Sequence, residues 1–254
     1  MPAVRDLLLE HLQYTFEKEG WQPPLGHAVA GLTAPQAAWK PGPERHSIWQ
    51  IVRHVQLWKR GVLHAWDGDP PDYEALSAAD WAEAGGDQAA WDAETEALRD
   101  LYAAFRRRIE AASDADLAAE RPWYRGAPPR PVANRLLHAF THDIYHAGQI
   151  QYLRALQSIP ADRLFFAAYD GNVRVIGEVL RVHPELVNAY NPGGWTALQM
   201  AAYTGKVEAV RVLLDHGADV HAVSQNELKT TALKGAEEEG HQDVAGLLRQ
   251  RGAR

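Results

Sequence analysis

The last third of the chain repeats itself with a fixed period, and this constrains the fold more than any other feature of the sequence. Residues 194–222 align with residues 229–253 at an offset of 35 positions. An earlier copy places Gly171 34 positions before Gly205. A period in this range is typical of solenoids, in which each repeat is one structural unit stacked on its neighbours. We therefore expect residues 161–254 to form a helical array of about three repeats.

The middle copy carries the most complete motif. It reads Thr-x-Leu-x-x-Ala-Ala-x-x-Gly from Thr196 and Leu-Leu-x-x-Gly-Ala-Asp-Val from Leu213. This pattern resembles ankyrin repeats. The first copy has Asp162 in place of the leading Thr, and the last has Glu237 and Arg249 at positions that are apolar in the middle copy. Polar residues on the outer side of a terminal repeat are what a solvent-facing cap requires.

The resemblance to ankyrin repeats implies a module that recognises a protein partner and carries out no chemistry. In that family, the fingertip loops and the concave faces of the first helices contact the partner. Tyr169, Trp195 and Tyr203 occupy such positions and are the predicted partner-binding residues. The competing interpretation, which we rank slightly ahead for so short an array, is that these rings cover neighbouring repeats or pack against the rest of the chain.

Residues 1–160 show a different, helical periodicity. Apolar residues follow a rhythm of three and four from Ile48 to Val62, which is the seam of a helical bundle. Ser47 and Gln50 form a capping box at the start of this helix. Three further amphipathic helices are expected, over 3–18, around 91–109 and over 136–153, with a long crossover at 67–86. These features predict an all-α four-helix bundle, followed by the repeats.

The last helix of this bundle carries two histidines four residues apart. His142 and His146 differ by only about 40° in direction around a helix, so both imidazoles can reach one metal ion. His146 falls in the apolar stripe of that helix. A pair of structural core histidines fits this spacing equally well, so a third ligand is needed to decide. His54, at the edge of the seam of the second helix, is the candidate, although it could also simply pack under Trp58.

Three segments of this half resemble one known family. They are LTAPQAAWKPGP, HSIWQIVRHVQLW and LLHAFTHDIYHAGQIQYLRAL, the last with the motif His-x-x-x-His-x-Gly-Gln. Residues 1–158 are similar to the DinB/YfiT superfamily of bacterial four-helix-bundle proteins, which is distinct from the similarly named DNA polymerase. The resemblance implies that His54, His142 and His146 bind one divalent metal, and it leaves His138 as a neighbour. The expected domains are therefore 1–158, the metal-binding bundle, and 161–254, the ankyrin repeats.

The chain contains no cysteine, so a transition-metal site must use imidazole and oxygen ligands. Zinc and nickel are the metals we expect. Three imidazoles leave coordination positions open, which is typical of catalytic sites. Some members of the family use a low-molecular-weight thiol, so we expect a thiol S-transferase or a hydrolase acting on a small molecule. No catalytic residue can be named. Asp143 follows His142 directly and is expected on the helix surface or in support of a ligand.

Composition removes several other classes of function. The net charge is −7 and neither half is basic, which argues against nucleic-acid binding. No apolar run approaches the length of a membrane span, and early charged residues argue against a signal peptide, so a cytoplasmic location is expected. Pairing of two bundles into a homodimer stays open. The alternative function is a non-enzymatic interaction protein with a structural metal site.

Overall fold

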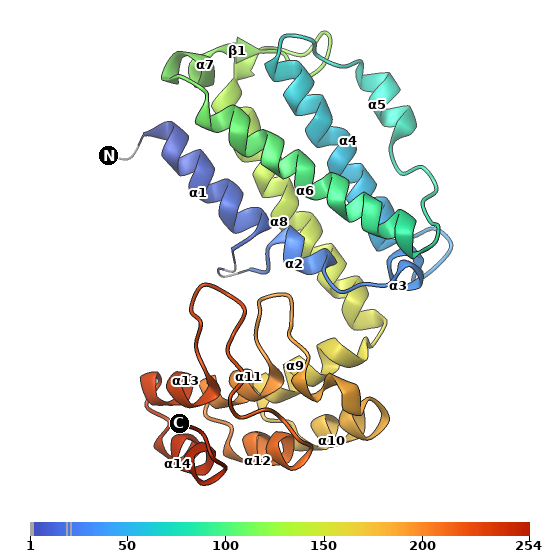
Figure 1. The fold of residues 1–254 in the computed structure, drawn as a ribbon. Coiled ribbons are helices and arrows are strands. Elements are labelled where there is room, and N and C mark those ends of the chain that lie inside the picture. The colour runs from blue at the N-terminus through green and yellow to red at the C-terminus, as the bar shows by residue number, and fades with distance from the viewer. Residues whose placement is uncertain (1–2, 19, 21) are drawn as a thin grey trace. The chain divides into compact units, whose positions relative to one another are not determined.

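The structure is a computed structural model that describes residues 3–18, 20 and 22–254. The chain divides into two compact units, residues 1–156 and 157–254, and both are predominantly helical (Figure 1). The predicted domain limits, 1–158 and 161–254, stay predictions. Among the described residues, no helix is both long enough and apolar enough to cross a membrane.

Four long helices build the first unit. They are α1 (Val4–Phe16), α4 (Ile48–Trp66), α6 (Gln88–Glu110) and α8 (Val132–Leu156). Helices α4 and α1 each pack against both α6 and α8, so the four helices close around a shared core (Figure 1). The predicted four-helix bundle is confirmed. Shorter elements connect and cover these helices: α2 (Leu25–Val29), α3 (Ala34–Ala38), α5 (Tyr73–Ala79), α7 (Asp114–Ala118), β1 (Glu120–Arg121) and β2 (Arg130–Pro131).

The two helices that matter most for function form where the sequence predicts them. Ser47 and Gln50 make a reciprocal capping box at the start of α4, which satisfies backbone N–H groups that have no partner within the helix. The predicted seam of α4 is buried except for Trp58, which is half-buried. In α8 the whole predicted stripe is buried: Leu136, Ala139, His146, Ile150 and Leu153. Burying a side chain of this size contributes roughly 1.5–3 kcal/mol, so these stripes fix which faces of α4 and α8 meet.

The long crossover between α4 and α6 is more structured than a linker. It contains α5, whose N-terminus is capped by Asp72. The helix ends at Ala79 with Asp80 as its C-cap, and Trp81 then adopts a left-handed backbone conformation with φ of 58°. This region is unfavourable for a residue with a bulky side chain, and it persists only where tertiary contacts hold it in place.

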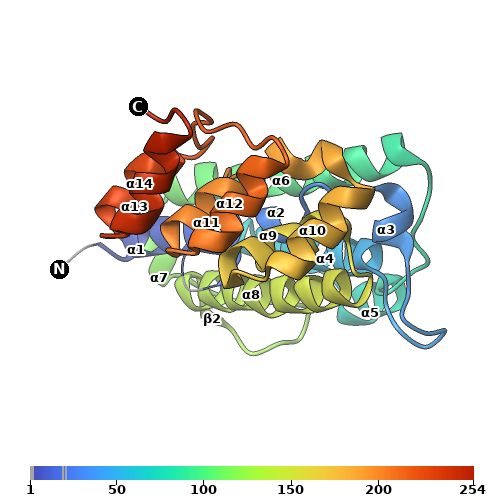
Figure 2. The ribbon, with the colours of Figure 1, turned by 90° about the horizontal axis from the view of Figure 1, so that it is seen from below.

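The second unit consists of three helical hairpins stacked side by side (Figure 2). One layer contains the first helix of each hairpin: α9 (Pro160–Asp170), α11 (Ala197–Tyr203) and α13 (Ala232–Glu238). The other layer contains the second helices: α10 (Val173–Val182), α12 (Val207–Asp215) and α14 (Gln242–Gln250), with a 3₁₀ turn at Pro184–Asn188. Gly171, Gly205 and Gly240 turn each hairpin with φ between 71° and 80°, a region that suits glycine. The predicted array of three repeats is confirmed.

Candidate metal centre

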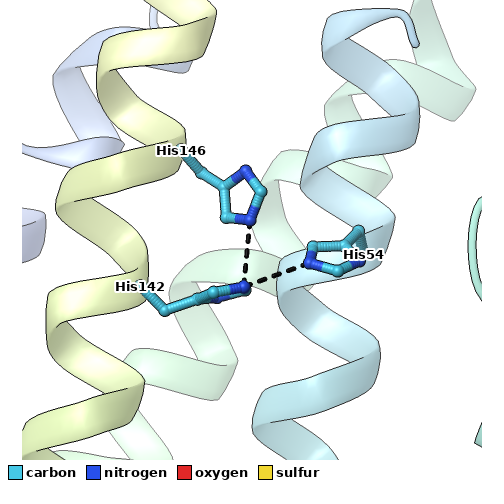
Figure 3. Close-up of side chains that lie close together, drawn as sticks. All are labelled: His54, His142 and His146. Carbon is cyan, nitrogen blue, oxygen red and sulfur yellow. Dashed lines mark hydrogen bonds between the residues drawn. The ribbon is translucent and has the colours of Figure 1, made fainter.

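Three histidine side chains from two helices converge in the bundle. His54 comes from α4, and His142 and His146 come from α8 (Figure 3). The Nε2 atom of His142 lies 3.1 Å from Nε2 of His54 and 3.0 Å from Nε2 of His146. The structure therefore brings together the three residues that the sequence selects. His138, one turn before His142, is not part of this cluster.

The Nδ1 atoms of His54 and His146 each have a hydrogen-bond partner. Nδ1 of His54 donates to Oδ1 of Asp80 at 2.7 Å, and Nδ1 of His146 donates to Oε1 of Gln149 at 2.7 Å. Because a carboxylate and an amide oxygen only accept hydrogen bonds, the proton of each neutral ring stands on Nδ1. The Nε2 lone pairs of His54 and His146 thus both face Nε2 of His142.

A divalent cation suits this arrangement of nitrogen atoms. Nε2 of His142 carries at most one proton, so it can donate to one neighbouring ring only. At least one of the two short N···N contacts is then a contact between lone pairs. A cation between the rings would turn three facing lone pairs into three coordinate bonds, and imidazole is a preferred ligand of zinc, nickel and similar metals. The donor set therefore fits a metal ion.

The electrostatic surroundings keep these rings neutral. Burial is the largest influence, and together with the neighbouring imidazoles it lowers the pKa of His142 to about 3. Burial likewise lowers the pKa of His146 to about 4. The pKa of His54 is also lowered by burial, although the carboxylate of Asp80 opposes the shift. At neutral pH all three imidazoles are therefore in the form that coordinates a metal.

Asp80 and Trp81 support His54 from the crossover. Besides accepting from His54, the carboxylate of Asp80 accepts from the indole N–H of Trp58 at 2.9 Å and from the backbone N–H of Trp81 at 3.0 Å. The ring of Trp81 stacks on His54 with 4.1 Å between centroids, and it also stacks on His46 at 3.9 Å. These contacts fix both the orientation and the tautomer of His54, which explains the strained backbone at Trp81.

The expectation for Asp143 on the helix surface is wrong. Its side chain is fully buried, and its Oδ2 lies 2.8 Å from Nζ of Lys59, which is 1% exposed. The ammonium also donates to the carbonyl oxygen of Ala139 at 3.2 Å. Burial raises the pKa of Asp143 to about 6 while the charge of Lys59 opposes this, so the carboxylate is ionised at neutral pH. The ion pair links α4 to α8 beside the three histidines and restricts how the two helices can slide.

Sequence reasoning missed Asp80, Trp81 and Lys59. None of them has a regular spacing from a histidine on its own element. Lys59 lies on a helix whose pattern predicts an apolar seam, and Asp80 lies 26 residues after its partner His54. The only sequence signal is that Asp80-Trp81 follows a short helical segment within a crossover.

A cavity of about 290 Å³ opens beside the histidine cluster. It reaches His54 and His142, so a ligand inside it would lie next to any metal held by these rings. The residues that line it come from α4, α5, α8 and the segment between β1 and β2: His54, Trp58, Lys59, Val62, Tyr73, Trp123, Tyr124, His138, Ala139 and His142.

The predicted partner-binding residues lie on two neighbouring repeats. The side chains of Tyr169 and Tyr203 are 52% and 45% exposed, and Trp195 is half-buried, with 6.1 Å between its ring and that of Tyr203. The hydroxyl of Thr204 donates to the backbone oxygen of Tyr169 and so ties the two repeats together. None of these three rings is fully buried in the repeat core. Partner binding through them stays a prediction.

Comparisons with known proteins agree with this architecture. A family model described as the DinB superfamily matches residues 24–150, and a model of ankyrin repeats in three copies matches residues 164–254. The human NAD-capped RNA hydrolase NUDT12 is 34% identical over 95 residues, which is 37% of this chain and 20% of that protein. Mouse protein phosphatase 1 regulatory subunit 27 is 32% identical over 95 residues, which is 37% of this chain and 60% of that protein. The chain thus spans a fifth of the first relative and less than two thirds of the second.

Proposed function

This chain belongs to the DinB superfamily and continues into ankyrin repeats, and we propose that its bundle is a metal-dependent enzyme acting on a small molecule. His54, His142 and His146 would hold one divalent metal, with zinc or nickel as the expected ion. The reaction would be either the transfer of a group to a thiol or a hydrolysis. The repeats would bring the enzyme to a protein partner.

The observation that carries this proposal is the cavity beside the three converging Nε2 atoms. Three protein ligands leave a coordination position open, and the cavity gives a small molecule access to His54 and His142. A purely structural metal is usually enclosed by four protein ligands. When bound, a divalent metal supplies Lewis acidity, which lowers the pKa of a water molecule or a thiol toward neutral pH.

Residues around the three histidines would orient the metal ligands and hold the two helices in place. Asp80 holds His54 in the tautomer that presents Nε2, and Gln149 does the same for His146. The ion pair of Lys59 and Asp143 keeps α4 and α8 in register. The walls of the cavity exclude water and orient the substrate.

The two proposed reactions differ in their nucleophile, which is a thiol in one and water in the other. A thiol nucleophile would have to arrive as a low-molecular-weight compound, because the chain has none of its own. In the transfer, a bond forms between the sulfur and the substrate, the leaving group departs with its electron pair, and the thiol proton is released. In the hydrolysis, water takes the place of the thiol.

Metal binding by matched histidine variants tests the proposal. We expect the full-length protein to bind one zinc or nickel ion, and His142→Ala to weaken binding by more than 100-fold, beyond the 10- to 100-fold typical of losing a residue that only supports a ligand. His138→Ala, one turn away on the same helix, is the control and should bind normally. Equal loss in both variants would contradict the site. If metal removal unfolds the bundle, the rival role, a structural metal in a non-enzymatic interaction protein, gains.

Recruitment of a partner by the repeats is the second part of the proposal. It is supported by the exposed rings of Tyr169 and Tyr203 on adjacent repeats. A double variant, Tyr169→Ala with Tyr203→Ala, should lose any partner that co-purifies with the full chain, without change in metal affinity. Retention of the same partner by the double variant would place the interaction elsewhere.

A further inference from the structure

The cavity beside the histidine cluster has walls that metal coordination alone does not explain. Four aromatic residues from three separate segments surround it: Trp58 on α4, Tyr73 on α5, and Trp123 and Tyr124 between β1 and β2. The ring of Tyr73 lies 5.9 Å from that of Trp58 and 5.0 Å from that of Tyr124, measured between centroids. The three rings therefore form a continuous aromatic wall. Such walls favour flat, polarisable ligands, which can stack or pack edge-on against them.

The charges around the cavity favour an acid over an amine. No aspartate or glutamate stands among the described residues that line it. The positive charge of Lys59 is balanced by Asp143, which lies behind the wall. The carboxylate of Asp80, which accepts from His54 and Trp58, lies beside the cavity and offsets part of the charge of a divalent metal. A divalent metal at His54 and His142 would still leave the site net positive, so it would attract an anionic donor and repel a cation.

We propose that this aromatic cavity binds a small acid with a flat, one- or two-ring body, whose oxygen or sulfur donor is directed toward His54 and His142. This inference rests on the proposed function and names its substrate class. The volume of about 290 Å³ lies at the lower end of the range for ligand pockets, which sets the limit of two rings.

Calorimetric binding of three probes to the full chain, with and without zinc, tests the inference. The probes are 2-naphthoate, the saturated decahydro-2-naphthoate and the cation 2-naphthylmethylammonium. We expect 2-naphthoate to bind the zinc-loaded protein at least threefold more tightly than either of the others. Tyr73→Ala should weaken its binding roughly three- to tenfold, because it removes the central ring of the wall. Tyr152→Ala, an exposed ring on α8 outside the cavity, is the matched control and should have no effect.

The outcomes separate this inference from the proposed function. Zinc affinity, measured for each variant, should not change, because neither tyrosine belongs to the histidine cluster. If zinc binds but 2-naphthoate binds no better than its saturated analogue, or is insensitive to Tyr73→Ala, the inference is overturned while the metal site stands. If zinc does not bind but 2-naphthoate still depends on Tyr73, the proposed function falls and the aromatic acid site is supported.

Discussion

The two units of this protein bury very different side chains. The bundle places an ion pair, Lys59 with Asp143, and two histidines, His54 and His146, among its buried residues. In residues 157–254, all of which the structure describes, the buried polar residues are uncharged: Thr196, Gln199, Ser224 and Thr230. These four residues lie at the start of a helix or in a loop. Thr196 and Gln199 form the capping box of α11, and the side chain of Gln199 also donates to the backbone oxygen of Thr230. The hydroxyl of Ser224 accepts from the backbone N–H of Thr230.

This contrast reflects two ways of using a helical core. Burying ionised groups costs free energy, and an apolar pair of similar volume would often be at least as stable. The bundle nevertheless keeps these groups close together, since Lys59, His54 and His142 line one cavity. The core of the repeats consists instead mainly of alanine, leucine and valine side chains. The bundle core thus surrounds a cluster of three histidines, whereas the repeat core is almost entirely apolar.

The largest effect that this comparison predicts comes from breaking the buried ion pair. Lys59→Met should lower the free energy of unfolding of the bundle by about 3–5 kcal/mol, because it leaves the charge of Asp143 buried without a partner. Lys234→Met, which breaks an exposed pair with Glu238 in the repeats, should change stability by less than about 0.5 kcal/mol. Denaturant unfolding of both variants is the measurement. Recovery of stability in the double variant Lys59→Met, Asp143→Leu would identify the unpaired charge as the cause. Equal losses of stability in Lys59→Met and Lys234→Met would contradict the expected difference between the two units.

A smaller effect is expected when the support of a metal ligand is weakened. Asp80→Asn keeps the shape of the side chain but removes the negative charge that fixes the Nδ1 proton of His54. Metal affinity should fall 10- to 100-fold. Glu83→Gln, an exposed carboxylate of the same crossover that pairs with Lys40, serves as control. Titration with zinc measures the metal affinity of both variants. An unchanged affinity in Asp80→Asn would show that the hydrogen bond between Asp80 and His54 does not contribute to metal binding.

A backbone substitution in the repeats should act on that unit alone. Gly205 has φ of 71°, and an added Cβ would lie 2.6 Å from the ring of His241. Gly205→Ala should therefore destabilise the repeats by about 1–2 kcal/mol without changing metal affinity. Gly246→Ala, in a helix where no atom lies within 4 Å of the new Cβ, should stabilise them by about 0.5–1 kcal/mol. Circular dichroism during thermal unfolding measures both, and a loss of metal affinity in Gly205→Ala would show that the units are coupled.

The metal-free bundle should also be sensitive to acid. Folding lowers the pKa of His142 to about 3 and that of His146 to about 4, from 6.5. Below pH 6.5 the unfolded chain thus binds more protons at these sites than the folded one, and stability falls as the pH decreases. Asp143 acts in the opposite direction between about pH 4 and 6, because its folded pKa is raised to about 6. The melting temperature of the bundle should drop by roughly 5–10 °C from pH 7 to pH 5, and bound metal should steepen the drop. A rise on acidification would contradict this sign.

The sequence was informative wherever a regular spacing carried the signal. The capping box at Ser47, the buried stripe of α8 and the period of the repeats all follow from contacts within one element or between identical elements. Asp143 shows where such reasoning fails. Its neighbour His142 faces the cluster, and a carboxylate one position later is predicted either at the helix surface or in support of a ligand. It lies in the core instead, where Lys59 reaches it from another helix.

By itself, the sequence determined two helical units and selected His54, His142 and His146 out of twelve histidines. Helical periodicity and family motifs are local, so they can be read along the chain. Only the tertiary structure decided what surrounds those rings: Asp80 and Trp81 from the crossover, the buried ion pair and the aromatic cavity. These contacts join segments far apart in the chain, and their strength depends on burial, which no spacing along the sequence encodes.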